Sequence, residues 1–146
     1  MVSRKDKEII EILQTEGRVP VSEIARRVDL SENGVRYRLE KLEEAGYIRN
    51  YTVLLNPRRF GKRVTAVFRL NTVPDNSQGL IGKLRDMEEL QVIYQTTGAY
   101  SIMAIGLFSD IEELNGFIEG KLASTDILEY TVDVVRRKLK ETTFSI

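Results

Sequence analysis

The segment Val21–Ile48 constrains the fold of this chain more than any other stretch. In its first part, Val21–Val28, apolar residues are spaced for one face of a short helix, and Asp29-Leu30 then interrupts the pattern as a turn. Ser31 can cap a following helix, because its hydroxyl can accept a backbone N–H of the first turn. That helix is expected to run to about Glu44. The segment is therefore predicted to form two short helices joined by a tight turn.

The residues on either side of this segment complete a small N-terminal domain. Arg4–Glu16 has the spacing of an amphipathic helix, and Gly17 stands where a left-handed C-terminal cap belongs. Gly46 is expected to end the third helix. Tyr47–Leu55 is rich in β-branched and large apolar residues, which predicts a short strand or wing.

The third helix has the layout of a DNA-reading helix. Its apolar stripe turns inward, and polar side chains lie on the opposite side near its start. In a helix-turn-helix, the first residues of the second helix enter the major groove, where Asn suits adenine and Arg suits guanine. A tyrosine at the same place can contact a thymine methyl group or a phosphate. The residues that we expect to reach base edges are Asn33, Arg36 and Tyr37.

Other residues of this region are expected to support DNA binding without reading bases. Ser31 and Gly34 belong to the tip of the helix, where Gly34 would allow a close approach of the backbone. Arg38 lies beside the apolar stripe and is expected to form a structural ion pair. Solvated surface is the alternative for any single basic residue, and a helical hairpin without a DNA role is the alternative for the whole segment. The candidate phosphate contacts, which supply affinity and salt dependence, are Arg26, Arg27, Lys41, Arg49, Arg58 and Arg59.

Composition limits the remaining possibilities. The chain has no cysteine and no histidine, which removes disulfides, the commonest zinc ligands, the usual haem ligands and the usual neutral-pH general base. No cofactor is therefore expected. No apolar run approaches the roughly 20 residues that span a bilayer. The N-terminus lacks the apolar region of a secretory signal, so a cytoplasmic location is expected.

The zero net charge hides an uneven distribution. Up to Arg63 the chain has 14 Lys and Arg against 10 Asp and Glu, whereas from Val64 on it has 8 against 12. A basic half is thus joined to an acidic half, which indicates two modules with separate roles. We predict a helix-turn-helix domain over 1–55, a linker over 56–63 and a second domain over 64–146.

The second half alternates strand and helix patterns in the order β-α-β-β-α-β. This order predicts a ferredoxin-like regulatory and oligomerisation domain whose two helices cover one face of the sheet. With the first half, the chain is expected to be α+β, an N-terminal (winged) helix-turn-helix followed by this domain. The predicted elements are a strand from Val64 to Leu70, a helix over 76–87, strands over 90–97 and 100–108, a helix capped by Asp110 with Ile111, Leu114, Ile118 and Leu122 as its core face, and a last strand over 128–137.

The third of these strands is apolar on both faces. Ile102 and Ala104 alternate with Met103 and Ile105, so both sets of side chains are hydrophobic. A sheet with helices on one face and water on the other is expected to alternate apolar and polar residues. A second copy of the same sheet would cover the second face, so we predict a homodimer formed through this domain.

The motifs together resemble the Lrp/AsnC family, the leucine-responsive and asparagine-responsive (feast/famine) regulators. The resemblance covers essentially the whole chain. It includes the segment KDKEIIEILQTEGRVPVSEIARRVDLSENGVRYRLEKLEEAGYI, the connector LLNPRRFG and the central turn TGAYS of the β-α-β-β-α-β unit. It implies a transcriptional regulator that binds pseudo-palindromic double-stranded DNA, forms dimers and often octamers, and responds to a small molecule, usually an amino acid.

The resemblance also places an effector near the turn between the second and third strands. Backbone N–H groups of such a turn can hold a carboxylate, and Asp133 on the last strand is suited to an α-amino group. The family often has Asp where Ser101 stands, so this chain departs from the usual pattern at the proposed site. An ordinary hairpin turn is the alternative reading. The candidate effector residues are Gly98, Ala99, Tyr100, Ser101, Thr131 and Asp133.

Two other functions fit the same architecture. One is an architectural DNA-packaging protein that binds without sequence preference. The other is an enzyme similar to tetrapyrrole (sirohaem) decarboxylases, which rely on histidine and which the absence of histidine disfavours. The expected function is a sequence-specific transcriptional regulator rather than an enzyme.

Overall fold

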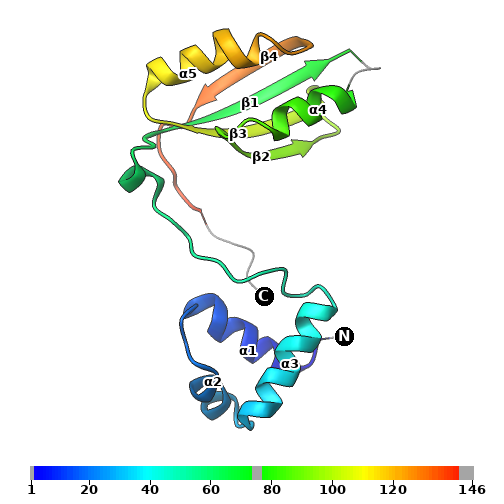
Figure 1. Ribbon diagram of the computed structural model, residues 1–146, viewed down its shortest axis with the longest axis vertical. Helices are drawn as coiled ribbons and strands as arrows, with labels where there is room; N and C mark the ends of the chain where they lie inside the picture. The colour runs from blue at the N-terminus through cyan, green and yellow to red at the C-terminus, as the bar shows by residue number, and fades with distance from the viewer. Residues whose placement is uncertain (1, 74–76, 142–146) are drawn as a thin grey trace. The chain divides into compact units, whose positions relative to one another are not determined.

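The computed structural model describes residues 2–73 and 77–141. The chain divides into two compact units, an N-terminal one that ends at Leu55 and a C-terminal one, Asn56–Lys140. Figure 1 labels the helices and strands of both units. Each unit has its own hydrophobic core, and each is described separately below.

Three helices form the N-terminal unit. They are α1 (Arg4–Thr15), α2 (Val21–Val28) and α3 (Glu32–Glu44). Their apolar faces meet in a core of Ile9, Ile24, Ala25, Val28 and Val35. The predicted helix-turn-helix is thus confirmed, and its second helix is α3.

The caps of these helices differ in part from the prediction. Gly17 is not a left-handed cap, because its φ is not positive. α1 ends at Thr15 and is capped by Glu16, whose φ is −131° and whose N–H donates to the Ile12 carbonyl at 2.8 Å. The left-handed residue is instead Asp29, at φ 53° in the turn after α2. Gly46, at φ 73°, follows the end of α3 as predicted.

The strand or wing predicted over 47–55 is wrong, since these residues form no strand. A strand needs a neighbour to share its backbone hydrogen bonds, and the pairings within the described chain involve only the sheet of the C-terminal unit. The segment is tied to α3 in other ways. The Tyr47 N–H donates to the Leu42 carbonyl at 2.8 Å, and the Tyr51 hydroxyl donates to Glu43 Oε1 at 2.7 Å.

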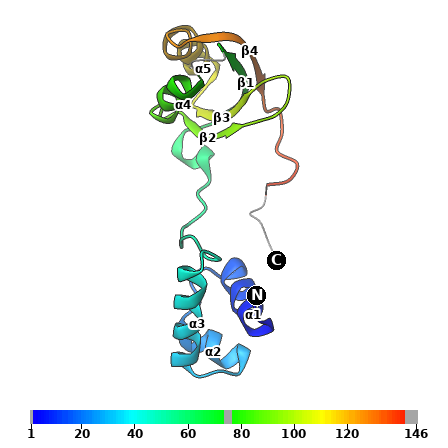
Figure 2. The ribbon, with the colours of Figure 1, turned by 90° about the vertical axis from the view of Figure 1, so that its right-hand side faces the viewer.

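The C-terminal unit is a four-stranded antiparallel sheet with helices on one face, as Figure 2 shows. The strand order is β2-β3-β1-β4. This is the predicted ferredoxin-like β-α-β-β-α-β arrangement. Its elements are the short 3-10 helix η1 (Pro57–Phe60), β1 (Val64–Thr72), α4 (Ser77–Arg85), β2 (Leu90–Gln95), β3 (Ile102–Phe108), α5 (Ile111–Phe117), the π-helical turn η3 (Ile118–Leu122) and β4 (Ile127–Val134).

Several element ends differ from the predicted ones. The helix predicted over 76–87 begins at Asn76, which lies outside the described residues, and α4 ends at Arg85. The last strand stops at Val134 rather than Arg137. Its partner β1 begins at Val64, so beyond the Val135 N–H, which donates to the Thr65 carbonyl, little of β1 is left to pair with. None of the described helices is long and apolar enough to cross a membrane.

Three phenylalanines fill the centre of the C-terminal core. The rings of Phe68, Phe108 and Phe117 lie 5.2–6.2 Å apart between centroids. Phe117 was not among the predicted core residues of its helix, whereas Ile111 was, and Ile111 is 49% exposed. Phe117 lies three residues after the buried Leu114, on the same face of α5, whereas Ile111 is the first residue of the helix.

The two faces of β3 differ in burial but not in chemistry. Ile102 and Ala104 are buried under the helices, whereas Met103 and Ile105 on the opposite face are half-buried. Ile105 is paired with Val67 on β1 and with Val92 on β2, so apolar residues from three strands meet on the face without helices. We call this surface, formed by Val67, Val92, Met103, Ile105 and Leu107, the open sheet face.

Candidate DNA interface and effector site

The tip of α3 is built around its N-cap. Ser31 Oγ accepts the Gly34 N–H at 3.0 Å, as the sequence predicted. A Cβ on Gly34 would stand 3.1 Å from this hydroxyl. Glycine is therefore suited to this position because it leaves room for the cap, a reason that lies within the helix itself.

The predicted base-reading residues lie on the exposed side of α3. Asn33 and Arg36 are exposed, Tyr37 is 61% exposed, and Val35 and Leu42 on the other side are buried. Within residues 2–73 and 77–141, neither Asn33 nor Arg36 forms a side-chain hydrogen bond or an ion pair. The structure thus brings three polar side chains to one face of the helix, and two of them, Asn33 and Arg36, have no polar partner among the described residues.

Arg38 has the structural role predicted for it. Its guanidinium donates to Asp6 Oδ1 at 2.8 Å and to Ser3 Oγ at 3.2 Å, which ties α3 to the start of α1. Ser3 and Asp6 also form the capping box of α1. Hydrogen bonds from Ser3 and Arg38 outweigh the effect of burial and lower the pKa of Asp6.

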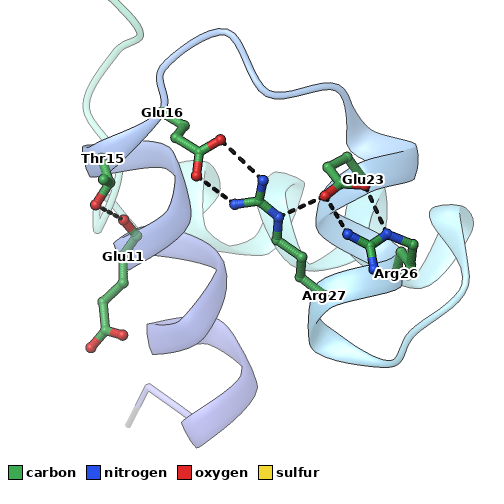
Figure 3. A network of polar contacts seen from close by, with 6 residues as sticks. All are labelled: Glu11, Thr15, Glu16, Glu23, Arg26 and Arg27. Carbon is green, nitrogen blue, oxygen red and sulfur yellow. Dashed lines mark hydrogen bonds and ion pairs between the residues drawn. The ribbon is translucent and has the colours of Figure 1, made fainter.

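Arg26 and Arg27 of α2 are held by carboxylates of their own domain, as Figure 3 shows. Arg27 donates to Glu16 at 2.5 Å and to Glu23 at 2.8 Å, and Arg26 donates to Glu23 at 2.6 Å. Arg27 thereby links the end of α1 to α2. A phosphate contact by either arginine, which the sequence suggested, would have to compete with these carboxylates.

The same network predicts a pH effect on stability. Hydrogen bonds from Arg26 and Arg27 lower the pKa of Glu23 from 4.5 to about 2. Because the folded-state pKa is depressed, Glu23 stabilises the fold above its ordinary pKa, and this stabilisation is lost as the pH falls from 4.5 towards about 2. Glu23→Gln is expected to flatten the pH dependence of unfolding in this window, measured by chemical denaturation at a series of pH values.

The matched control for this experiment is Glu40→Gln. Glu40 is an exposed carboxylate of α3 that forms no hydrogen bond with the described residues. Glu40→Gln is expected to leave the pH dependence of unfolding close to that of the unmodified chain. An unchanged profile for Glu23→Gln would show that the network contributes nothing to folding in acid.

Lys41, also predicted as a phosphate contact, is partly engaged. Its Nζ lies 2.6 Å from Glu44 and 5.8 Å from the centre of the Tyr37 ring. As far as the described residues show, Arg36 is consequently the one basic side chain of α2 and α3 without an acidic partner, since Arg26, Arg27, Arg38 and Lys41 all have one.

The predicted effector turn is held by hydrogen bonds to a residue that the sequence did not single out. Asn71 at the end of β1 donates to the Ala99 carbonyl at 2.9 Å and accepts the Ser101 N–H at 2.9 Å. The hydroxyl of Thr96 also donates to the Tyr100 carbonyl at 2.5 Å. Asparagine near a strand end is a common residue in many contexts, so no sequence signal pointed to this contact.

The polar residues of β4 lie next to this turn on the open side of the sheet. Glu129, which pairs with Asn71 across the strands, accepts the Tyr100 hydroxyl at 3.2 Å. Asp133, expected to pair with an amino group, forms an ion pair with Arg69. Thr131 Oγ1 is buried and has no hydrogen-bond partner among the described residues. Contacts of Asn71 with Ala99 and Ser101, and of Glu129 with Tyr100, thus connect the predicted turn to β1 and β4. Arg69, Asn71 and Glu129 are additions to the predicted set.

The chain matches two family models in this order. Residues 2–49 match a winged helix-turn-helix DNA-binding model, and residues 65–144 match the Lrp/AsnC ligand binding domain. The HTH-type transcriptional regulator LrpA of Pyrococcus horikoshii is 33% identical over 141 residues, which cover 96% of this chain and 100% of that protein. The HTH-type transcriptional regulator Ptr1 of Methanocaldococcus jannaschii is 34% identical over 122 residues, covering 84% of this chain and 82% of Ptr1.

Solved structures agree with this assignment. A transcriptional regulator of Neisseria meningitidis, solved as a complex with L-Met, superposes with a TM-score of 0.91 at 26% identity and covers 98% of this chain and 95% of that chain. AsnC of E. coli shares the fold, with a TM-score of 0.93 at 23% identity over 99% of this chain and 98% of that chain.

A helix-turn-helix joined to a ferredoxin-like domain of this kind defines a DNA-binding transcriptional regulator. The chain belongs to the Lrp/AsnC family.

Proposed function

We propose that the chain is a homodimeric regulator that reads a pseudo-palindromic operator with Asn33, Arg36 and Tyr37 and is modulated by an amino acid. The observation that carries the DNA-reading part is the free guanidinium of Arg36. The other basic side chains of α2 and α3 are held by carboxylates, so Arg36 is the cation available for a bidentate contact with guanine. Selection of binding sequences from a random duplex pool would test it, and recovery of no common motif would favour DNA packaging instead.

The effector part of the proposal rests on the turn at Gly98. The backbone N–H groups of Gly98, Ala99 and Tyr100 form no hydrogen bond with the described residues, whereas that of Ser101 is occupied by Asn71. Three free N–H groups in a bent loop suit the carboxylate of an amino acid. The L-Met complex of the Neisseria relative supports an amino acid as the effector class.

A thermal-shift screen against the twenty amino acids tests the effector proposal. A ligand that binds only the folded state raises Tm in proportion to the logarithm of its concentration above Kd. We expect at least one amino acid to do so, and we expect Asn71→Ala to reduce the shift because the turn loses both of its amide contacts.

Asn115→Ala, an exposed change on α5, is the control for this screen and is expected to keep the full shift. If no amino acid raises Tm, or if Asn71→Ala keeps the full shift, the turn is an ordinary hairpin connection.

Further parts of the proposal concern assembly and setting. The open sheet face supports a homodimer, and the family resemblance supports higher oligomers such as an octamer. A regulator of cytoplasmic DNA acts in the cytoplasm. An enzymatic role similar to that of tetrapyrrole decarboxylases would rely on histidine, which this chain lacks. A haem-like chromophore in the absorption spectrum of the purified protein would contradict the regulator assignment.

A further inference from the structure

The charges of the C-terminal unit are sharply segregated. From Val64 to Val135 the sequence has 4 Lys and Arg against 11 Asp and Glu. The segments on either side, 56–63 and 136–140, contain no acidic residue. Their basic residues are Arg58, Arg59, Lys62 and Arg63 in the first, and Arg136, Arg137, Lys138 and Lys140 in the second. We call these two segments together the basic end of the unit.

The topology brings the two segments to one end of the sheet. β1 and β4 are antiparallel neighbours, so the start of β1 lies beside the end of β4. The N–H of Val135 donates to the Thr65 carbonyl at 2.8 Å, one residue before Arg136. Figure 1 shows the segment before β1 and the segment after β4 leaving the sheet at the same end. Two basic segments far apart in sequence therefore lie at the same end of the sheet.

The arginines of the basic end differ from most cations in the body of the unit. In the body, Arg69, Lys83 and Lys121 are each paired with a carboxylate. At the basic end, five arginines are exposed and form no ion pair or side-chain hydrogen bond with the described residues. These are Arg58, Arg59, Arg63, Arg136 and Arg137. Arg136 and Arg137 also line a shallow surface hollow with Leu139.

We propose that the basic end is a second DNA contact, which binds phosphates of the duplex beside the bases that α3 reads. Unpaired guanidinium groups bind phosphate oxygens through two parallel hydrogen bonds. The five unpaired arginines also repel one another, and a polyanion relieves this repulsion. Such contacts add affinity and salt dependence without reading sequence.

Covalent connection favours DNA as the occupant. The first basic segment begins directly after Leu55, the last residue of the helix-turn-helix unit, so DNA held by α3 is tethered to the basic end at a high effective concentration. The inference rests on the DNA-reading function proposed above. It extends that function from one domain to both.

The test compares the full-length chain with the double variant Arg136→Gln/Arg137→Gln. Binding is measured over a salt series on two duplexes: the selected site alone, and the same site with longer flanks. Each lost phosphate contact is expected to make the slope of log K against log salt shallower by about 0.9, so by up to about 2 for the double variant. We expect this change on the flanked duplex and little change on the short one.

The double variant Lys83→Gln/Arg85→Gln, on α4, is the control, because it removes the same charge elsewhere in the unit. It is expected to keep the salt slope of the unmodified chain. Equal slopes for the basic-end variant and this control on the flanked duplex would overturn the inference.

A changed oligomeric state with an unchanged slope would also overturn the inference, since the basic end would then contact the acidic body of another copy. Arg36→Ala is measured on the same duplexes. If Arg36→Ala abolishes site preference while the basic-end variant does not change binding, α3 reads the DNA as proposed but the basic end does not contact it.

Discussion

Arg36→Ala is expected to weaken binding to the selected operator by about 1–3 kcal/mol, which is roughly a tenfold to hundredfold loss of affinity. It is also expected to relax the base preference at one position of each half-site. The reason is that Arg36 is exposed near the start of α3, and its side chain forms no hydrogen bond with the residues that the structure describes. Removing it takes away contacts to a base edge and leaves the helix intact. Competition binding against a panel of single-base variants of the operator measures both effects.

Arg26→Ala is the matched control for this variant. Arg26 is an exposed arginine of the neighbouring helix, but Glu23 already holds its guanidinium. Arg26→Ala is expected to change the affinity for all DNA sequences equally, or not to change it. Retention of both affinity and base preference by Arg36→Ala would mean that α3 does not read DNA in the way proposed.

The helix-turn-helix could be predicted because its determinants are local. The apolar spacing of α2 and α3, the Ser31 cap and the glycine after α3 all lie within a few residues of the features they control. The two-faced pattern of β3 was also visible in the sequence, because alternation along a strand is a property of neighbouring residues. These parts of the fold follow from short-range rules.

The partners of the charged side chains could not be predicted in the same way. Arg27 meets Glu16 across eleven residues, and Arg69 meets Asp133 across 64 residues, so both pairs depend on how the elements pack. The role of Asn71 under the effector turn depends on tertiary contacts for the same reason, since it lies 28 residues from Ala99. Composition identified a basic region but not which of its cations are free.

The incorrect strand over 47–55 has a related cause. Strand propensity describes a preference for a pleated surface that neighbouring strands must supply. The described residues of the chain supply no neighbouring strand there, so residues 47–55 remain unpaired. The open sheet face also depends on a neighbour that the described chain does not supply, since no helix covers its apolar side chains.

Ile105→Glu is expected to convert the proposed homodimer largely to monomers. Ile105 lies at the centre of the open sheet face, between Val67 and Val92, and its side chain takes no part in the core under the helices. In a symmetric dimer each copy would bury a carboxylate against the apolar surface of its partner. Burying an unpaired charge costs roughly several kcal/mol per ion, so the dimer dissociation constant is expected to rise by about a hundredfold or more.

Sedimentation over a range of protein concentrations measures this effect, and circular dichroism confirms that the fold is kept. Ile105→Thr is a milder variant that keeps the β-branched shape, and it is expected to weaken the dimer less than the glutamate does. Gln95→Glu places the same charge at an exposed position on β2 and is expected to leave the dimer intact.

DNA binding is expected to fall with dimerisation, because a monomer holds one half-site and loses the avidity of two linked reading helices. If Ile105→Glu remains a stable dimer, the charge lies in solvent, and the interface must lie elsewhere on the chain. If it becomes a folded monomer that binds the palindrome as tightly as before, Asn33, Arg36 and Tyr37 do not act in symmetric pairs.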